Sequence, residues 1–253
     1  TYCCEEGKFT TKFIQEAILK LKFKEWMDND KITIFMTEKS REENWLDRPY
    51  REREKQMAET KGVDLPEYRG GLQSVLKESF ASHLNESEYT IIPLGANEEE
   101  LWRIFQNIIN SLREKDELYI DITHAMRNIP VQMLAVAVYA RVVKDVQVKA
   151  IYYGAFEAGN KGAEGLTEAP IFDLITFLDV IDWSQAAYSF GRYGNSEQIE
   201  ELFRVQKERS SVKMRDLFKV VTEIGNITSG LETSRGYYDF KDASKNKGGK
   251  SIL

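Results

Sequence analysis

The chain has 253 residues, 42% of them hydrophobic, so it can bury a sizeable core in one large domain or in a domain with a small companion. Its net charge of −6 argues against a general nucleic-acid coat, because long polyanions bind to broad basic surfaces, but a small anionic ligand needs only a few local donors. No apolar run approaches the roughly 20 residues of a membrane helix. No secretory signal opens the chain, and the cysteines, Cys3 and Cys4, are adjacent. We therefore expect a soluble cytoplasmic protein with no disulfide framework and no membrane partner.

The first part of the chain predicts helices and strands in alternation. Apolar residues recur at helical spacing in 11–26, and the short apolar run 31–36 suits a buried strand. The charged stretch 38–62 predicts a solvated helix or loop. A helical pattern over 71–80 and a strand over 89–94 follow.

The alternation continues to residue 154. The clearest helical period covers 98–112, with Asn97 as its N-cap and glutamates in its first turn. A strand over 117–122, a helix over 124–143 and a strand over 147–154 complete the pattern. Apolar strands that alternate with helices are typical of a parallel sheet covered on both faces, so we predict an α/β fold with a mainly parallel sheet.

A second, all-helical unit is predicted beyond a boundary near residue 182. Its expected helices cover 183–190, 197–207 and 212–231. The glycine-containing stretch 157–170, before the boundary, predicts a mobile connection.

Both ends of the chain look incomplete. Thr1 opens a stretch with strand character, and the residues after 240 resemble a frayed tail. We expect the first strand of the sheet to lie before Thr1, and the helical region 183–253 to be only part of an effector or dimerisation unit.

Polar side chains crowd the joint that follows strand 117–122. In a doubly wound sheet, ligands bind outside the carboxyl ends of the strands, and a helix start there binds anions. Thr123 and Arg127 are four residues apart, as are His124 and Asn128, which predicts one helical face with four polar groups. Arginine suits phosphate and asparagine suits the edge of adenine. The helix dipole favours a neutral imidazole at His124.

Each of these residues also has a structural explanation. Asp121 or Thr123 can cap a helix, and Pro130 suits a first helical turn. His124 can be a structural histidine, and Arg127 can belong to a surface ion pair. The cluster at a strand end nevertheless favours an anion site. Dinucleotide, P-loop and nucleophile-elbow motifs are absent, and two histidines with two adjacent cysteines predict no metal site.

The stretch DITHAMRNIP (121–130) resembles the Asp-x-Thr-His-Gly signature of the CARF-domain proteins that accompany type III CRISPR systems. Ala125 and Met126 stand where that group typically has Gly-Phe. Four further segments are similar to the same family in the same order: 35–45, 91–105, 150–158 and 169–195. The resemblance covers most of residues 1–195.

The resemblance implies a Rossmann-like CARF domain over 1–182 that forms a homodimer. Its expected ligand is a cyclic oligoadenylate, cyclic tetra-adenylate above all, with no other cofactor. By position in the family, the ligand-binding residues are Thr37, Glu38, Lys39, Gly95, Asn97, Thr123, His124, Arg127 and Asn128. Asp121 would support the site structurally.

Three functions stay open. The favoured one is a receptor that allosterically controls an attached HEPN-type ribonuclease, which would act on single-stranded RNA. The Arg-x4–6-His motif of that enzyme is not present, because neither His83 nor His124 completes one in a C-terminal domain. The alternatives are a ring nuclease that linearises its own cyclic ligand, and a sensor without catalysis. A nucleotide-cofactor enzyme is the least expected reading.

Overall fold

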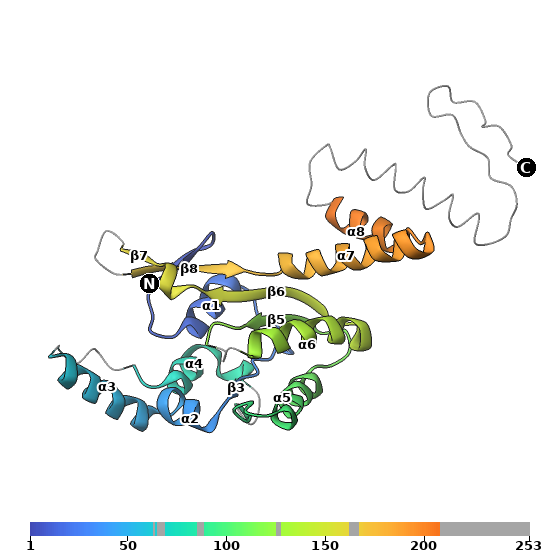
Figure 1. Cartoon of the computed structure of the whole chain (residues 1–253). Coiled ribbons are helices and arrows are strands. Elements are labelled where there is room, and N and C mark those ends of the chain that lie inside the picture. The colour runs from blue at the N-terminus through green and yellow to red at the C-terminus, as the bar shows by residue number, and fades with distance from the viewer. Residues whose placement is uncertain (63, 65–68, 85–88, 125–127, 162–166, 208–253) are drawn as a thin grey trace, which may run out of the picture. The chain divides into compact units, whose positions relative to one another are not determined.

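The first level of organisation is a division into two compact units, Thr1–Ile175 and Thr176–Leu253. The boundary predicted near residue 182 falls inside α7 (Thr176–Tyr193), the helix that opens the second unit. The computed structural model (Figure 1) describes residues 1–207 apart from 63, 65–68, 85–88, 125–127 and 162–166, with side chains to residue 204.

Parallel strands form the centre of the first unit. β5 (Glu117–Asp121) pairs in parallel with β6 (Gln147–Gly154). β3 (Phe35–Met36) pairs in parallel with β4 (Thr90–Ile91) in a separate two-stranded sheet. The α/β class with helices around parallel strands is therefore confirmed. The predicted strands over 31–36 and 89–94 shorten to two residues each.

An antiparallel part extends the larger sheet. β8 (Thr167–Asp173) lies antiparallel to β6, and β1 (Tyr2–Cys4) pairs in parallel with β8. β2 (Gly7–Phe9) forms a hairpin with β1, which gives the order β2-β1-β8-β6-β5. The sheet is thus mixed.

The mobile connection predicted over 157–170 is wrong for its described residues. β7 (Asn160–Lys161) pairs with β8, and η3 (Phe156–Ala158) is a 3-10 turn. Ala169 and Ile171 are both buried, at alternate positions of β8. This period of two is the mark of a half-buried strand. The glycines in this stretch indicated a loop, and the period of two in β8 was therefore not recognised in the sequence.

The helices of the first unit lie close to their predicted positions. They are α1 (Ile14–Lys22), α4 (Leu72–Phe80), α5 (Glu98–Ser111) and α6 (Ile129–Lys144). The predicted N-cap is also observed, because the Asn97 side chain accepts a hydrogen bond of 2.9 Å from Glu100 N.

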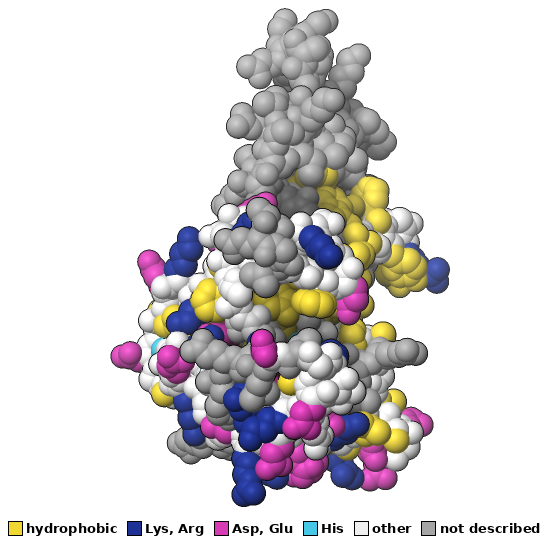
Figure 2. Space-filling model, turned by 90° about the vertical axis from the view of Figure 1, so that its left-hand side faces the viewer, with side chains coloured by type: hydrophobic (Ala, Val, Ile, Leu, Met, Phe, Trp, Pro, Cys, Tyr) yellow, Lys and Arg dark blue, Asp and Glu magenta, His cyan; other side chains and the backbone are white. Residues whose placement is uncertain are grey.

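The charged stretch after β3 is largely helical. It contains α2 (Glu38–Ser40), the π-helical turn η1 (Arg41–Trp45) and α3 (Asp47–Lys61). Basic and acidic side chains are interspersed in the lower part of Figure 2, where α3 faces the viewer. Their mixture fits the solvated helix predicted from the charge pattern.

The start of α6 corrects one prediction. The helix begins at Ile129 instead of 124, and Thr123 and His124 lie in a turn before it. Pro130 occupies the first turn of α6, where a missing N–H costs nothing. His124 and Asn128 therefore do not share a helical face, and Arg127, the predicted partner of Thr123, lies outside the described residues. The reason given for a neutral His124 is also lost, because the dipole acts within the first turn.

Two apolar clusters hold the first unit together. One packs α1 against β1, β6 and β8, with Ile14 and Ala17 fully buried. The other gathers α4, η1 and the end of β3 around Trp45 and Leu76. The first cluster fixes α1 across the strands, so that its first turn reaches the carboxyl end of β6.

The described part of the second unit consists of α7 and α8 (Glu197–Lys207). The rings of Trp183 and Phe203 meet edge to face at 4.9 Å and hold the two helices together. The helix predicted over 183–190 is thus part of a longer one, and the one over 197–207 is observed. The helix predicted over 212–231 lies outside the described residues.

Among the described helices, none combines the length and the apolar character that crossing a membrane requires.

Candidate functional site at the carboxyl ends of the strands

A hydroxyl group bridges the ends of β5 and β6, next to the backbone hydrogen bond from Ile122 N–H to the Tyr152 carbonyl. Thr123 Oγ1 donates to Asp121 Oδ1 at 2.6 Å and accepts the N–H of Gly154 at 2.8 Å. Asp121 Oδ1 also accepts the Thr123 N–H at 2.9 Å, which closes a tight turn. The hydroxyl hydrogen is therefore used inside the joint. Thr123 offers a ligand at most the remaining acceptor capacity of its oxygen.

Asp121 is the electrostatic centre of the joint. Asp121 is exposed to solvent, but the protein atoms crowded around its carboxyl group partly desolvate it, and this desolvation raises its pKa. Hydrogen bonds from Thr123, the charge of His124 and a hydrogen bond from Gln15 oppose the rise in this pKa. His124 itself is exposed. His124 therefore lies near enough to Asp121, at the mouth of the site, for its charge to act on the carboxyl group.

The first turn of α1 reaches the same joint. Gln15, its second residue, hydrogen-bonds Asp121. Ile14 lies under Gly154, where an added Cβ would come within 2.5 Å of the Ile14 side chain. Only glycine leaves room for this contact between α1 and the end of β6.

An ion pair with a buried carboxylate anchors this turn of α1. The Glu16 side chain is 1% exposed, and Arg69 binds it with two hydrogen bonds of 2.9 and 3.2 Å. Thr11 donates a further hydrogen bond to Glu16. Such a bidentate pair fixes direction as well as distance. Arg69 thus positions Gln15 at Asp121 through the neighbouring Glu16.

The loop after β4 meets the start of α6. Gly95 has a φ of +76°, and a Cβ at this position would lie 2.4 Å from the Asn128 amide nitrogen. Glu100 accepts the N–H groups of Gly95 and Ala96 at 2.9 Å each, which fixes the loop. Asn128 is the N-cap of α6, but its side chain makes no capping hydrogen bond. Its amide is directed at Gly95 instead.

A hollow of about 480 Å³ adjoins this loop between the ends of β3 and β4. Its floor is apolar, while Lys39 and Arg103 stand at its rim with side chains 79% and 57% exposed. Its lining residues are Thr37, Glu38, Lys39, Ile91, Ile92, Pro93, Leu94 and Arg103. An apolar floor beside cations suits a base attached to a phosphate.

The residues after β3 also have structural partners. Thr37 caps α2 by accepting from Ser40 N at 3.2 Å. Glu38 pairs with Arg41 at 2.7 Å, and Lys39 lies 3.7 Å from Glu43. These ion pairs are exposed and weak, so an anionic ligand can compete for Lys39.

Residues 1–157 match the family described as the CARF domain of the CRISPR system endoribonuclease Csx1. The chain belongs to this family. The resemblance to CARF proteins is confirmed, and it gives this part of the chain a CRISPR-associated, ligand-sensing role.

A curated relative agrees with this membership. CRISPR-associated protein MJ1674 of Methanocaldococcus jannaschii is 29% identical over 161 residues, which are 62% of this chain and 25% of that protein. The chain thus spans about a quarter of the length of this relative.

The CARF domain brings the predicted residues together in two groups. Thr123, His124 and Asn128 lie around Asp121 and Gly95, while residues 37–39 line the hollow. Leu94 and Gly95 connect the two groups along the chain. Asn97 caps α5 beside them. Arg127 lies outside the described residues, and the ligand-binding roles stay predictions.

Sequence reasoning missed Gln15, Gly154 and Arg103. Gln15 and Arg103 lie within the first two turns of helices that start near the carboxyl ends of the strands. Polar residues in such turns are a usable signal, because these starts surround the ligand edge. Nothing in the local sequence marks Gly154, whose role depends on the close contact with Ile14 of α1.

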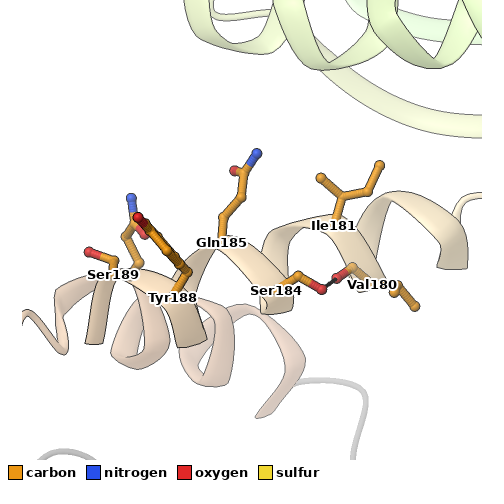
Figure 3. Close-up of a pocket in the computed structure, with 7 residues that line it drawn as sticks. Val180, Ile181, Ser184, Gln185, Tyr188 and Ser189 are labelled. Atoms are coloured by element: carbon orange, nitrogen blue, oxygen red, sulfur yellow. Dashed lines mark hydrogen bonds between the residues drawn. The ribbon is translucent and has the colours of Figure 1, made fainter. Parts of the chain in front are cut away.

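A second hollow, of about 540 Å³, lies in the other unit on α7 and α8 (Figure 3). Its lining residues are Val180, Ile181, Ser184, Gln185, Tyr188, Ser189 and Gln198. None of them is charged, and the Ser184 hydroxyl already donates to the carbonyl of Val180 at 2.7 Å. None of the described residues that line this hollow supplies the cations that a phosphate ligand requires, so the candidate site is the one in the CARF domain.

The double role of the Thr123 hydroxyl predicts a stability effect. Thr123→Val keeps the shape but removes the hydrogen bonds to Asp121 and from Gly154, which should lower the free energy of unfolding by about 1–3 kcal/mol. Thr123→Ser restores the hydroxyl and should recover most of this loss. Urea denaturation of the three proteins measures it. Equal stability of the Val and Ser variants would show that the bridge contributes nothing.

The raised pKa of Asp121 predicts a pH dependence with a definite sign. Above pH 3.8 the unfolded chain loses this proton while the folded chain keeps it to higher pH, so folded stability falls through that window. The substitution Asp121→Asn removes the charge and retains an oxygen that can accept both bonds from Thr123. We expect this variant to gain stability over wild type as the pH rises, in urea denaturation from about pH 3 to 7.

Asp121→Ala is the matched control. It removes the acceptor together with the charge, so it should be less stable than Asp121→Asn at every pH. Stability curves of Asp121→Asn and wild type that run parallel across the range would contradict the buried-carboxylate interpretation.

Proposed function

We propose that the protein is a receptor for a cyclic oligoadenylate, with cyclic tetra-adenylate as the expected ligand. One observation carries the proposal: the loops after β3, β4, β5 and β6 adjoin one another in a row. The hollow joins the first two, the contact of Gly95 with Asn128 joins the second to the third, and the bond of Thr123 with Gly154 joins the third to the fourth. An extended ligand of repeating units needs such a row of subsites.

The chemistry of the row suits repeated nucleotides. Lys39, Arg103 and Arg127 would bind phosphates, and the apolar floor of the hollow would support a base. The amide of Asn128 can pair with the edge of an adenine. His124 is exposed at the mouth, where it can hydrogen-bond the ligand.

Symmetry supports a homodimer. A ring of four or six identical nucleotides has two-fold symmetry, and an isologous dimer presents each recognition residue twice. Ligand binding would then shift a two-state dimer in the cytoplasm and control an attached effector. We propose a HEPN-type ribonuclease acting on single-stranded RNA, in line with the family's description as a CRISPR system endoribonuclease.

A ring nuclease is the second candidate, and the exposed His124 in the turn after β5, three residues from Asp121, favours it. A 2′-hydroxyl of the ligand can attack the adjacent phosphate. That attack gives a linear product ending in a 2′,3′-cyclic phosphate and releases the 5′-oxygen. A site needs only to align the attack and stabilise the charge. A sensor without catalysis would bind the same ligand and leave it intact.

The receptor proposal predicts that Arg127→Ala weakens binding without unfolding the protein. Losing a charge-assisted phosphate bond should lower affinity about 10- to 100-fold. The measurement is retention of labelled cyclic tetra-adenylate and cyclic hexa-adenylate, with melting curves alongside. Arg48→Ala, which removes an arginine 91% exposed on α3, is the control and should bind normally. Wild-type protein that retains neither ligand would refute the receptor proposal.

His124→Ala distinguishes the sensor from the ring nuclease. A sensor should leave ligand intact in wild type and variant, with weaker binding in the variant. A ring nuclease should linearise the ligand, and the variant should bind it but cleave about 10²–10⁴-fold more slowly. Chromatography of the labelled ligand after incubation reads out both. We expect intact ligand; rapid wild-type cleavage that collapses in His124→Ala would reverse this preference.

A further inference from the structure

The residues just before α1 are held by α3, a helix from a later part of the chain. The side chain of Glu54 on α3 is 7% exposed, and Lys12 Nζ donates a hydrogen bond to its Oε1. The Tyr50 hydroxyl, one turn earlier on α3, donates to the same oxygen at 3.2 Å. The Tyr50 ring also lies 5.3 Å from the ring of Phe13, the neighbour of Lys12. Two adjacent residues before α1 are thus bound by two residues that lie one turn apart on α3.

The Glu54 carboxylate is buried, so its charge depends on these partners. A carboxylate removed from water requires a cation and hydrogen bonds in compensation. Its second oxygen lies 3.6 Å from Arg51 but accepts no hydrogen bond among the described residues. The charge-assisted hydrogen bond from Lys12 to the first oxygen is therefore a main part of the compensation. This requirement ties Lys12 to one place on α3.

The residues that follow Lys12 reach the candidate site. Ile14 lies against Gly154, where an added Cβ would come within 2.5 Å of the Ile14 side chain. The Gly154 N–H donates to the Thr123 hydroxyl at 2.8 Å. Lys12 and Ile14 are two residues apart, which is about 7 Å at most along the chain. A displacement of Lys12 is therefore passed on to the contact that supports the joint of β5 and β6.

The beginning of α3 is connected to the hollow. Thr37 and Lys39 line the hollow, and α2 and η1 lead from them along the chain toward α3. η1 ends at Trp45 and α3 begins at Asp47, so one residue separates the two. The Trp45 side chain, 1% exposed, holds this connection in the second apolar cluster. α3 is thus connected to the hollow through η1 and to the joint through Lys12.

We propose that Glu54 and Lys12 are positioning residues for the candidate site: the pair holds the first turn of α1 against the joint of β5 and β6 and thereby sets the affinity for the ligand. The second half of this inference rests on the proposed function. α3 then keeps the hollow and the joint at a fixed separation, so that neighbouring subsites fit successive units of one nucleotide ligand. Neither residue needs to touch the ligand, because supporting contacts give a site its precision.

Hydrogen exchange of the full chain, measured by mass spectrometry, tests the positioning. Lys12→Met and Glu54→Gln each remove one charge and change the size of the side chain little. Both should speed exchange in residues 150–155, which contain the Gly154 N–H, by about 3- to 30-fold. Exchange in α5 should stay as in wild type. Lys12→Arg restores the cation and should return exchange in 150–155 to the wild-type rate.

A purely structural pair would give a different pattern of exchange. It would loosen the domain evenly, so equal acceleration in α5 and in 150–155 would overturn the proposal. Unchanged exchange in 150–155 would also overturn it. Arg48→Met is the matched control, because it removes an exposed ion pair with Glu52 on the same helix, with side chains 91% and 60% exposed. This control should change neither the exchange in 150–155 nor ligand binding.

Retention of labelled cyclic tetra-adenylate tests the effect on affinity. Lys12→Met should bind about 3- to 30-fold more weakly than wild type. The double variant Lys12→Met with Glu54→Gln should lose no more affinity than the weaker-binding single variant, since two residues that act as a pair are not additive. Additive losses would show that the residues act separately and would overturn the proposal.

The two measurements separate this inference from the receptor proposal. Faster exchange in 150–155, in a protein whose wild type retains no cyclic oligoadenylate, supports the positioning contact and refutes the receptor. Normal exchange in Lys12→Met, together with ligand retention by wild type, refutes the positioning contact and supports the receptor. Faster exchange with unchanged affinity would overturn the link between the pair and the ligand.

Discussion

The candidate site depends on one hydroxyl group that is bonded on both sides. Thr123 ties the carboxylate at the end of β5 to the backbone at the end of β6, and so extends the connection of the two strands beyond their last backbone hydrogen bond. Around this anchor, two glycines allow close approach. Gly154 admits Ile14 from α1, and Gly95 admits Asn128 from α6. The polar groups at the mouth are placed by contacts behind them, which is how a site gains precision.

The sequence predicts most of the fold because its periodic patterns are strong. The apolar stripe and the Asn97 cap place α5 to within a residue, since capping and amphipathicity agree there. At residues 121–129 the apolar pattern and the capping signals do not indicate the same helix start. Apolar residues continue a helical pattern upstream of Ile129, but Asp121 holds the Thr123 N–H in a turn. β8 was not predicted because the glycines before it indicated a loop. The two buried residues at alternate positions, Ala169 and Ile171, were too few to outweigh that signal.

The location of the site was predictable from the sequence, but the hydrogen-bond partners of its individual residues were not. Polar residues at a strand end indicate a binding edge whatever the details, because all parallel strands end at the same edge. Whether a hydroxyl faces a ligand or its own backbone depends on partners distant in sequence. Thr123 is committed to Gly154, 31 residues away, and Gln15 is held by the pair of Glu16 with Arg69, 53 residues apart. Such pairings leave no trace in local patterns.

The pairing of the N-terminal hairpin with β8 has a consequence for the order of folding. Thr1 and Thr167 are hydrogen-bonded across 166 residues of chain, and β1 lies beside β8. During synthesis from the N-terminus, β1 and β2 must wait for β8 to emerge before they can join the sheet. α1 packs on those same strands, so its first turn settles only then. The edge that carries the candidate site therefore closes last, after the strands that carry Asp121 and Gly154 have already paired.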